Sequence, residues 1–203
     1  LMLGRPGPLD HGDALRARQL FDKKDYTAAA DAWPRGTFAQ QSRMCRTLAK
    51  NGGKSRDAWR AVDHTLRKLF LSAFQSDLFN RVMAQRIERG LFDRIENGDV
   101  AYKHVNGACF RVEDAAVEQP RCEAFEISPT GPLFGSRMTE ATGIPGEMEQ
   151  GVLAESGVDA ELLSGRDSGR LDGGRRSMRV PLKDLRYEVG ADERGQYLKL
   201  EFA

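Results

Sequence analysis

The sequence predicts an α+β fold, with a helix-rich front half followed by short strands and long loops. Through residues 14–89, apolar side chains recur every three or four positions, which is the period of helices with one buried face. After Gly90 the pattern changes to short apolar or alternating runs, separated by turn-forming Gly and Asn. Helices that precede the strands, instead of alternating with them, are typical of the α+β class.

The composition is that of a globular protein with one or two domains. The 203 residues are 30% charged and 40% hydrophobic. No apolar run approaches the roughly 18 residues that a membrane span needs, and no signal peptide is visible. Cys45, Cys109 and Cys122 are odd in number and far apart, which argues against a disulfide framework or a zinc site and fits a reducing cytoplasm. The net charge of +1 does not indicate a polyanionic partner, so the distribution of charge is more informative.

Helices are predicted at residues 14–22, 25–33, 38–50 and 56–89. Asp13 and Ser55 are placed to cap the first and the last of them. Pro34 ends the second helix, and Asn51-Gly52-Gly53 ends the third. The last helix is expected to form the spine of the core, because its apolar positions keep the helical spacing.

Behind Gly90, strands are predicted at residues 100–104, 108–112, 125–127, 178–180, 185–189 and 197–203, and short helices at 113–118 and 147–155. Asn106-Gly107 is a strong signal for a two-residue hairpin turn. Residues 164–174 are polar and Gly-rich and are expected to form a mobile loop. The chain begins at Leu1 and stops within an alternating run, so we expect it to be a piece of a larger protein.

Two segments stand apart from this pattern, residues 74–80 and residues 128–135. The second, Ser-Pro-Thr-Gly-Pro-Leu-Phe-Gly, has two Pro and two Gly around an apolar pair, and it predicts a fixed loop that exposes its backbone. Gly131 and Gly135 are expected to need backbone angles that a Cβ resists. Phe134 is expected to anchor the loop on the long helix near Phe79.

Basic side chains gather in two places. The first group has six basic residues within 18 positions and only one acid, Asp57, among them. Its members are Arg43, Arg46, Lys50, Lys54, Arg56 and Arg60. The second group, within a Gly-rich segment that also holds Asp167 and Asp172, is Arg166, Arg170, Arg175, Arg176 and Arg179. Both groups suit phosphate contacts, the second because its Arg side chains are expected on flexible backbone. From the residues alone, a solvated surface is the better explanation of such charges.

Other motifs have simpler explanations. Gly52-Gly53-Lys54-Ser55 ends like a phosphate-binding loop, but Leu48 stands where that loop needs Gly, and a helix precedes it. The carboxylate pairs Asp22/Asp25 and Glu147/Glu149 have a spacing that is common on solvated helix faces. No companion at metal-ligand spacing accompanies His11, His64 and His104.

The segments SPTGPLFG, at residues 128–135, and QSDLFN, at residues 75–80, resemble motifs of the tRNA pseudouridine synthase D (TruD) family. The resemblance runs from about residue 12 to residue 203. It implies an isomerase that converts a tRNA uridine, of the uridine 13 type, to pseudouridine with one Asp and neither cofactor nor metal. It also implies a cytoplasmic enzyme with tRNA as its partner, no membrane contact and a monomeric full-length form.

The resemblance also implies a division of the chain. Residues 12–179 correspond to the inserted domain of the family, residues 180–203 to strands that return into its mixed catalytic sheet, and residues 1–11 match nothing in it. The family's catalytic Asp lies in a G-x-K-D motif upstream of these residues, so no catalytic residue is assigned here. Asp184 follows Leu182-Lys183 but is in the wrong place for that role.

With the resemblance, RNA contact becomes the better explanation of the first basic group. The candidate RNA-binding residues are Arg43, Arg46, Lys50, Lys54, Arg56, Gln75, Ser76 and Asn80. The last three face the catalytic cleft on the family interpretation, and ordinary contacts between helices explain them equally well. Two other hypotheses remain for the chain as a whole: a non-catalytic RNA-binding module, and a structural or interaction domain.

Overall fold

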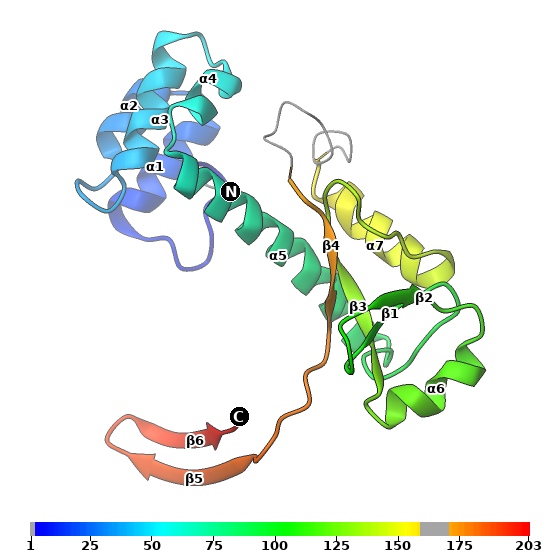
Figure 1. Ribbon diagram of the computed structural model, residues 1–203. Coiled ribbons are helices and arrows are strands. Elements are labelled where there is room, and N and C mark those ends of the chain that lie inside the picture. Colours follow the sequence, from blue (N-terminus) through cyan, green and yellow to red (C-terminus); the bar gives the residue numbers. More distant parts are fainter. Residues whose placement is uncertain (1–2, 159–170) are drawn as a thin grey trace. The chain divides into compact units, whose positions relative to one another are not determined.

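The computed structural model describes residues 3–158 and 171–203 and confirms the α+β class (Figure 1). Its contacts divide the chain into two compact units, Leu1–Ser72 and Ala73–Ala203. The first unit is helical, and the described strands all belong to the second.

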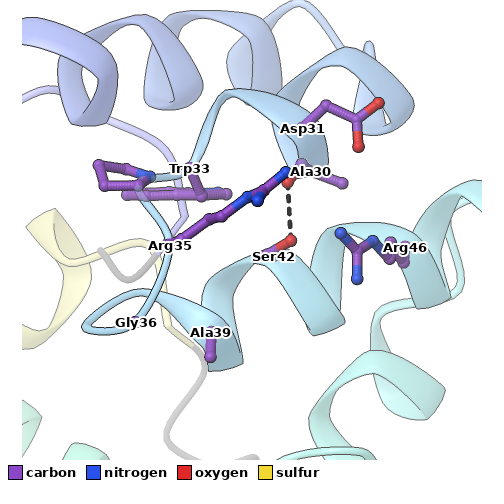
Figure 2. Close-up of a pocket in the computed structure, with 9 residues that line it drawn as sticks. Ala30, Asp31, Trp33, Arg35, Gly36, Ala39, Ser42 and Arg46 are labelled. Atoms are coloured by element: carbon purple, nitrogen blue, oxygen red, sulfur yellow. Dashed lines mark hydrogen bonds between the residues drawn. The ribbon is translucent and has the colours of Figure 1, made fainter.

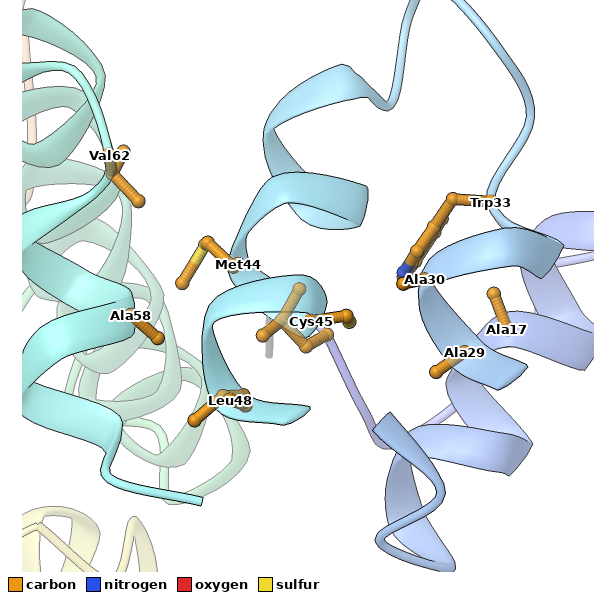
Figure 3. Packing of buried hydrophobic residues seen from close by; sticks show 10 residues of the cluster. Ala17, Ala29, Ala30, Trp33, Met44, Cys45, Leu48, Ala58 and Val62 are labelled. Atoms are coloured by element: carbon orange, nitrogen blue, oxygen red, sulfur yellow. The ribbon is translucent and has the colours of Figure 1, made fainter. Parts of the chain in front are cut away.

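The first unit consists of α1 (Gly12–Asp22), α2 (Tyr26–Ala32), α3 (Ala39–Lys50), α4 (Ser55–Arg60) and the beginning of α5 (His64–Glu88). Helix α3 packs against both α2 and α4. Its Met44, Cys45 and Leu48 side chains belong to the buried hydrophobic cluster of the first unit, which Figure 3 shows. On α2 the buried side chains are Ala29 and Ala30, whose small size lets the helices approach closely.

The prediction of a single helix at 56–89 is wrong, because these residues form two helices, α4 and α5. Asp63 is the reason: its Oδ1 accepts hydrogen bonds from the backbone N–H groups of Thr65 at 2.9 Å and Leu66 at 3.3 Å, which starts a new helix. These backbone hydrogen bonds also lower the pKa of Asp63. The buried Val62 holds the break against the core.

The two expected N-terminal caps are also wrong. The Asn51 side chain accepts a hydrogen bond from the Lys54 backbone N–H at 3.0 Å, which fixes the turn before α4. Lys54 is therefore the N-cap of α4, and Ser55 is its first helical residue. Helix α1 begins at Gly12, so Asp13 lies in its first turn. A carboxylate in that turn still stabilises the helix, because it interacts favourably with the helix dipole.

The second unit contains a four-stranded sheet in the order β2-β1-β3-β4, made by β1 (Val100–Lys103), β2 (Cys109–Arg111), β3 (Ile127–Leu133) and β4 (Gly174–Ser177). All of these strands pair antiparallel. The unit also holds α6 (Ala115–Glu123), α7 (Gly143–Glu155) and a hairpin of β5 (Arg186–Asp192) with β6 (Gly195–Glu201). The strand expected at 178–180 lies instead at 174–177, where it can pair with β3.

The SPTGPLFG segment is not a loop, and most of it forms the central strand β3. Residues 127–132 of β3 are buried, and Phe134, which follows the strand, is 4% exposed. The two prolines are tolerated because β3 pairs with β1 through residues 127–129 and with β4 through residues 130–133. Each half of β3 is therefore paired with one strand only. A proline, which lacks an N–H, does not have to interrupt a hydrogen-bond ladder on the unpaired side.

The glycines of this segment are required for space and not for backbone angle. Neither Gly131 nor Gly135 has a positive φ, so the expectation of strained angles is wrong. A Cβ on Gly131 would lie 2.6 Å from ring atoms of Phe79, and one on Gly135 would lie 2.5 Å from the Leu171 carbonyl oxygen. Phe79 and Phe134 share one buried cluster, which confirms the expected anchor on the long helix.

Two buried ion pairs complete the second unit. The Arg86 guanidinium on α5 donates to both carboxylate oxygens of Asp99, at 2.7 and 3.0 Å. The Arg175 guanidinium on β4 donates to both oxygens of Glu149 on α7, at 2.7 and 2.8 Å. Burial raises the pKa of Glu149, and the hydrogen bonds from Arg175 oppose that shift. These pairs join α5 to the start of β1 and α7 to β4.

Gln75 on α5 supports the end of β3. Its side-chain amide is buried and donates to the backbone carbonyls of Phe134 at 2.9 Å and Asp172 at 3.1 Å. The Q-S-x-L-F-N motif therefore holds the SPTGPLFG motif through one amide and through the packing of Leu78 and Phe79.

The substitution Phe134→Ala should lower the free energy of unfolding by about 3–5 kcal/mol, because it removes a buried ring from a packed cluster. Chemical denaturation of the chain measures this loss. Val105→Ala, at a side chain 87% exposed in the same unit, is the matched control and should change stability by less than about 0.5 kcal/mol. A loss for Phe134→Ala as small as that of the control would contradict the packing described for β3.

Replacing Gln75 with Leu should destabilise the second unit by about 1–3 kcal/mol, since the Phe134 carbonyl then loses its buried donor. Asn80→Ala on the exposed side of the same helix is the control, and it should leave stability nearly unchanged. Denaturation curves of the two variants can be compared directly. Equal stability of both would show that the Gln75 amide contributes nothing to holding β3.

Candidate nucleic-acid interface

The predicted basic group forms an exposed face in the first unit. Arg43, Arg46 and Lys50 lie on the side of α3 opposite its buried Met44 and Leu48. Lys54, Arg56 and Arg60 are also exposed, in the following turn and in α4. We call the six basic residues the α3–α4 basic face.

The acid within this group does not neutralise it. Asp57 accepts a hydrogen bond from the Asn51 side-chain amide at 3.1 Å. Within residues 3–158 and 171–203, no ion pair is formed by Arg43, Arg46, Lys50 or Lys54. Their charges are therefore available to a polyanion in solution.

A pocket of about 540 Å³ adjoins the basic face through Arg46. Figure 2 shows it between the end of α2, the turn at Arg35-Gly36 and α3. Its polar lining includes Asp31, Arg35, Ser42 and Arg46, and the Ser42 hydroxyl donates to the Ala30 carbonyl at 2.7 Å. Two guanidinium groups against one carboxylate leave the pocket with a positive balance, which suits a phosphate group.

The wall of the pocket is rigid. Trp33 is 3% exposed and stacks on Phe38, with ring centroids 5.2 Å apart, and the Arg18 guanidinium lies 5.5 Å from the Trp33 ring centroid. Arg35 was not among the predicted site residues. Its only sequence signal was a basic residue beside Pro34 and Gly36, a turn that holds it next to Arg46.

The polar residues of α5 have different environments. Gln75 is buried against β3, Ser76 is half-buried and Asn80 is exposed. Gln75 thus positions the backbone of residues 134 and 172, whereas Asn80 is accessible from solvent.

The second arginine group does not lie on flexible backbone where the structure describes it. Arg175 is paired with Glu149, the Arg176 guanidinium lies 5.5 Å from the Phe79 ring centroid, and Arg179 is buried. That expectation is therefore wrong for these three. Arg175 and Arg176 lie in β4, and Arg179 is held by hydrogen bonds to Ser128 and to the carbonyls of Cys122 and Ile127. Arg166 and Arg170, and most of the predicted 164–174 loop, lie outside the described residues.

The remaining candidates show no further catalytic arrangement. Burial raises the thiol pKa of Cys45, Cys109 and Cys122, so the ordinary form of each is the neutral thiol. Among the residues that the structure describes, no three His, Cys, Asp or Glu side chains are grouped as metal ligands. None of the described helices is long and apolar enough to cross a membrane.

Comparisons with known proteins identify the family. The family model described as tRNA pseudouridine synthase D (TruD) matches residues 1–203. The tRNA pseudouridine synthase D of Geobacter metallireducens is 43% identical over 189 residues, which are 88% of this chain and 45% of that protein. The protein of the same name from Geotalea daltonii is 39% identical over 202 residues, which are 100% of this chain and 49% of that protein.

The fold agrees with a solved structure that carries the TruD name, from Methanosarcina mazei. The TM-score is 0.74 at 25% identity, and the match covers 98% of this chain and 49% of that one. The chain therefore spans about half the length of the relatives that it matches. Because the family model and relatives above 30% identity cover nearly all of its residues, the chain belongs to the tRNA pseudouridine synthase D (TruD) family.

Proposed function

We propose that this chain is part of a tRNA pseudouridine synthase and that its first unit supplies RNA-binding surface to the enzyme. The α3–α4 basic face is the observation that carries this proposal. Among the described residues, its Arg43, Arg46, Lys50 and Lys54 side chains form no ion pair, and exposed cations of this kind attract the phosphate backbone of RNA and position it without reading its sequence. The name shared by the relatives makes tRNA the expected RNA.

The proposed reaction is the isomerisation of a tRNA uridine, of the uridine 13 type, to pseudouridine. The bond from N1 to C1′ breaks, the base turns, and C5 bonds to C1′, so no atom is gained or lost. On the resemblance, one Asp within a G-x-K-D motif performs this chemistry without cofactor or metal. That motif does not occur in these 203 residues, so we propose that they bind RNA without turning it over.

Roles follow for the candidate residues. We propose that Arg43, Arg46, Lys50, Lys54 and Arg56 contact phosphates, that Ser76 and Asn80 lie at the RNA, and that Gln75 acts by holding β3. We further propose that residues 12–179 are the inserted domain, that residues 180–203 return to the catalytic domain, and that the full-length enzyme is a cytoplasmic monomer.

The double substitution Arg43→Ala/Arg46→Ala should weaken the binding of an unmodified tRNA transcript. With each phosphate contact that is lost, binding releases about one fewer counterion. The slope of log affinity against log salt should therefore become less steep by about two. Fluorescence anisotropy at several salt concentrations measures both affinity and slope. The unfolding free energy should stay within about 0.5 kcal/mol of the wild type, because both side chains are exposed.

Arg16→Ala/Lys23→Ala is the matched control, since it removes two exposed charges of the same sign from α1 and its end. It should leave the salt slope unchanged within error. If both double variants bind tRNA like the wild type, or if the wild type does not bind, the α3–α4 basic face is a solvated surface and this proposal fails.

A further inference from the structure

Among the described residues of the second unit, one buried cation has no counter-charge. Arg179 is 7% exposed, and its hydrogen-bond partners are all neutral: the Ser128 hydroxyl at 3.2 Å, and the carbonyls of Cys122 at 2.7 Å and Ile127 at 3.2 Å. Its Nη2 also lies 3.1 Å from the Cys122 sulfur. Burial raises the pKa of that thiol, so it does not supply a negative charge.

Two other arginines in the same unit show what is missing. The side chains of Arg86 and Arg175 are each 2% exposed, and each donates two hydrogen bonds to a buried carboxylate. Within residues 3–158 and 171–203, no carboxylate pairs with Arg179, and its Nη1 has no hydrogen-bond partner. Because buried charges are normally paired, this guanidinium has both a charge and a donor left for an anion.

One aromatic ring lies over this cation, and two more follow beside that ring. The Phe125 ring centroid lies 4.3 Å from the Arg179 guanidinium carbon, and Phe125 is 40% exposed. The His104 ring lies 6.3 Å from Phe125 and 5.4 Å from Tyr102, between ring centroids. His104 Nε2 is 2.8 Å from the same Ser128 hydroxyl that accepts from Arg179.

Phe125 occupies a backbone position that favours glycine. Its N–H donates to the Cys122 carbonyl, the N–H of Glu126 donates to the Arg121 carbonyl, and its φ is +55°, which together form a Schellman ending to α6. A phenylalanine in the left-handed region is strained, and such strain persists at functional sites. The turn itself would be more stable with glycine, so the fold of the turn does not explain the ring.

We propose that Arg179, His104 and Phe125 form a nucleotide-binding site, in which a phosphate accepts from Arg179 and a base stacks on the exposed part of Phe125. An unpaired guanidinium beside aromatic rings matches the two halves of a nucleotide, and single-stranded RNA is recognised by stacking of this kind. This inference rests on the proposed RNA-binding function and assigns it a second contact, in the second unit.

The test is the substitution Phe125→Gly, which removes the ring and relieves the strained backbone. Affinity for a ten-residue oligouridylate should fall about tenfold, which is the loss expected for one stacked base. The thermal midpoint should stay the same or rise, because glycine favours a positive φ. Val117→Ala, at an exposed position of α6, is the control and should change neither quantity. If the glycine variant folds poorly, Phe125→Asn replaces it, since Asn also tolerates this backbone.

A second readout follows the site itself. The NMR signal of His104 should shift when uridine monophosphate is added to the wild type, and it should shift much less in the Phe125→Gly variant. If a tetraglutamate peptide shifts the signal and uridine monophosphate does not, the cation serves a protein carboxylate and the proposal is overturned.

The outcomes separate this inference from the proposed function. If Arg43→Ala/Arg46→Ala weakens tRNA binding while Phe125→Gly binds oligouridylate like the wild type, the nucleotide site is refuted and the α3–α4 basic face remains. If Phe125→Gly lowers the thermal midpoint without changing affinity, the ring only shields Arg179, and the site is refuted. A wild-type chain that binds neither RNA overturns both.

Discussion

The carbonyl groups of β3 constrain the second unit more than any other feature. This strand holds two prolines and is buried, so parts of its backbone have no strand neighbour to supply a donor. Polar side chains supply them: Arg175 donates to the Thr130 carbonyl and Arg179 to that of Ile127, and Gln75 donates to the carbonyl of Phe134, which directly follows the strand. A buried carbonyl without a donor costs about 1–3 kcal/mol, so these contacts determine where α5 and β4 lie against β3.

This constraint changes how the polar residues of the motifs are understood. Gln75, Arg175 and Arg179 have the chemistry of RNA-binding residues, yet each is used first to satisfy backbone carbonyls in β3 or directly after it. Arg175 is neutralised by Glu149 and has no charge left over. Arg179 is used in the same way but lacks a carboxylate partner among the described residues, and this difference makes it the one of the two that can also take a ligand.

Local sequence patterns predicted α1, α2, α3 and the basic side of α3, because period and turn chemistry act over a few residues. They also predicted that β1 and β2 form a hairpin, but the expected two-residue turn is wrong, because the Lys103 N–H donates to the Ala108 carbonyl and residues 104–107 lie between the strands. They failed where a distant partner decides. The SPTGPLFG segment has the composition of a loop, and only pairing with β1 and β4 makes it a strand. Arg175 appeared to be one of a group of phosphate-binding arginines in a Gly-rich segment, because its partner Glu149 lies 26 residues away. Asp63, by contrast, gave a local signal for a helix start that the apolar period obscured.

The two candidate RNA contacts rest on different physics, and they would make different contributions to recognition. The α3–α4 basic face has long, exposed side chains, so on the proposal it would add salt-dependent affinity with little discrimination among sequences. Arg179 is held by the sheet through hydrogen bonds, and Phe125 is held by the end of α6. A fixed donor beside a fixed ring accepts a nucleotide in few orientations, and its contacts are screened less by salt because they are buried. If both proposals hold, affinity for RNA depends mainly on the first unit, and the placement of an individual nucleotide depends on the second.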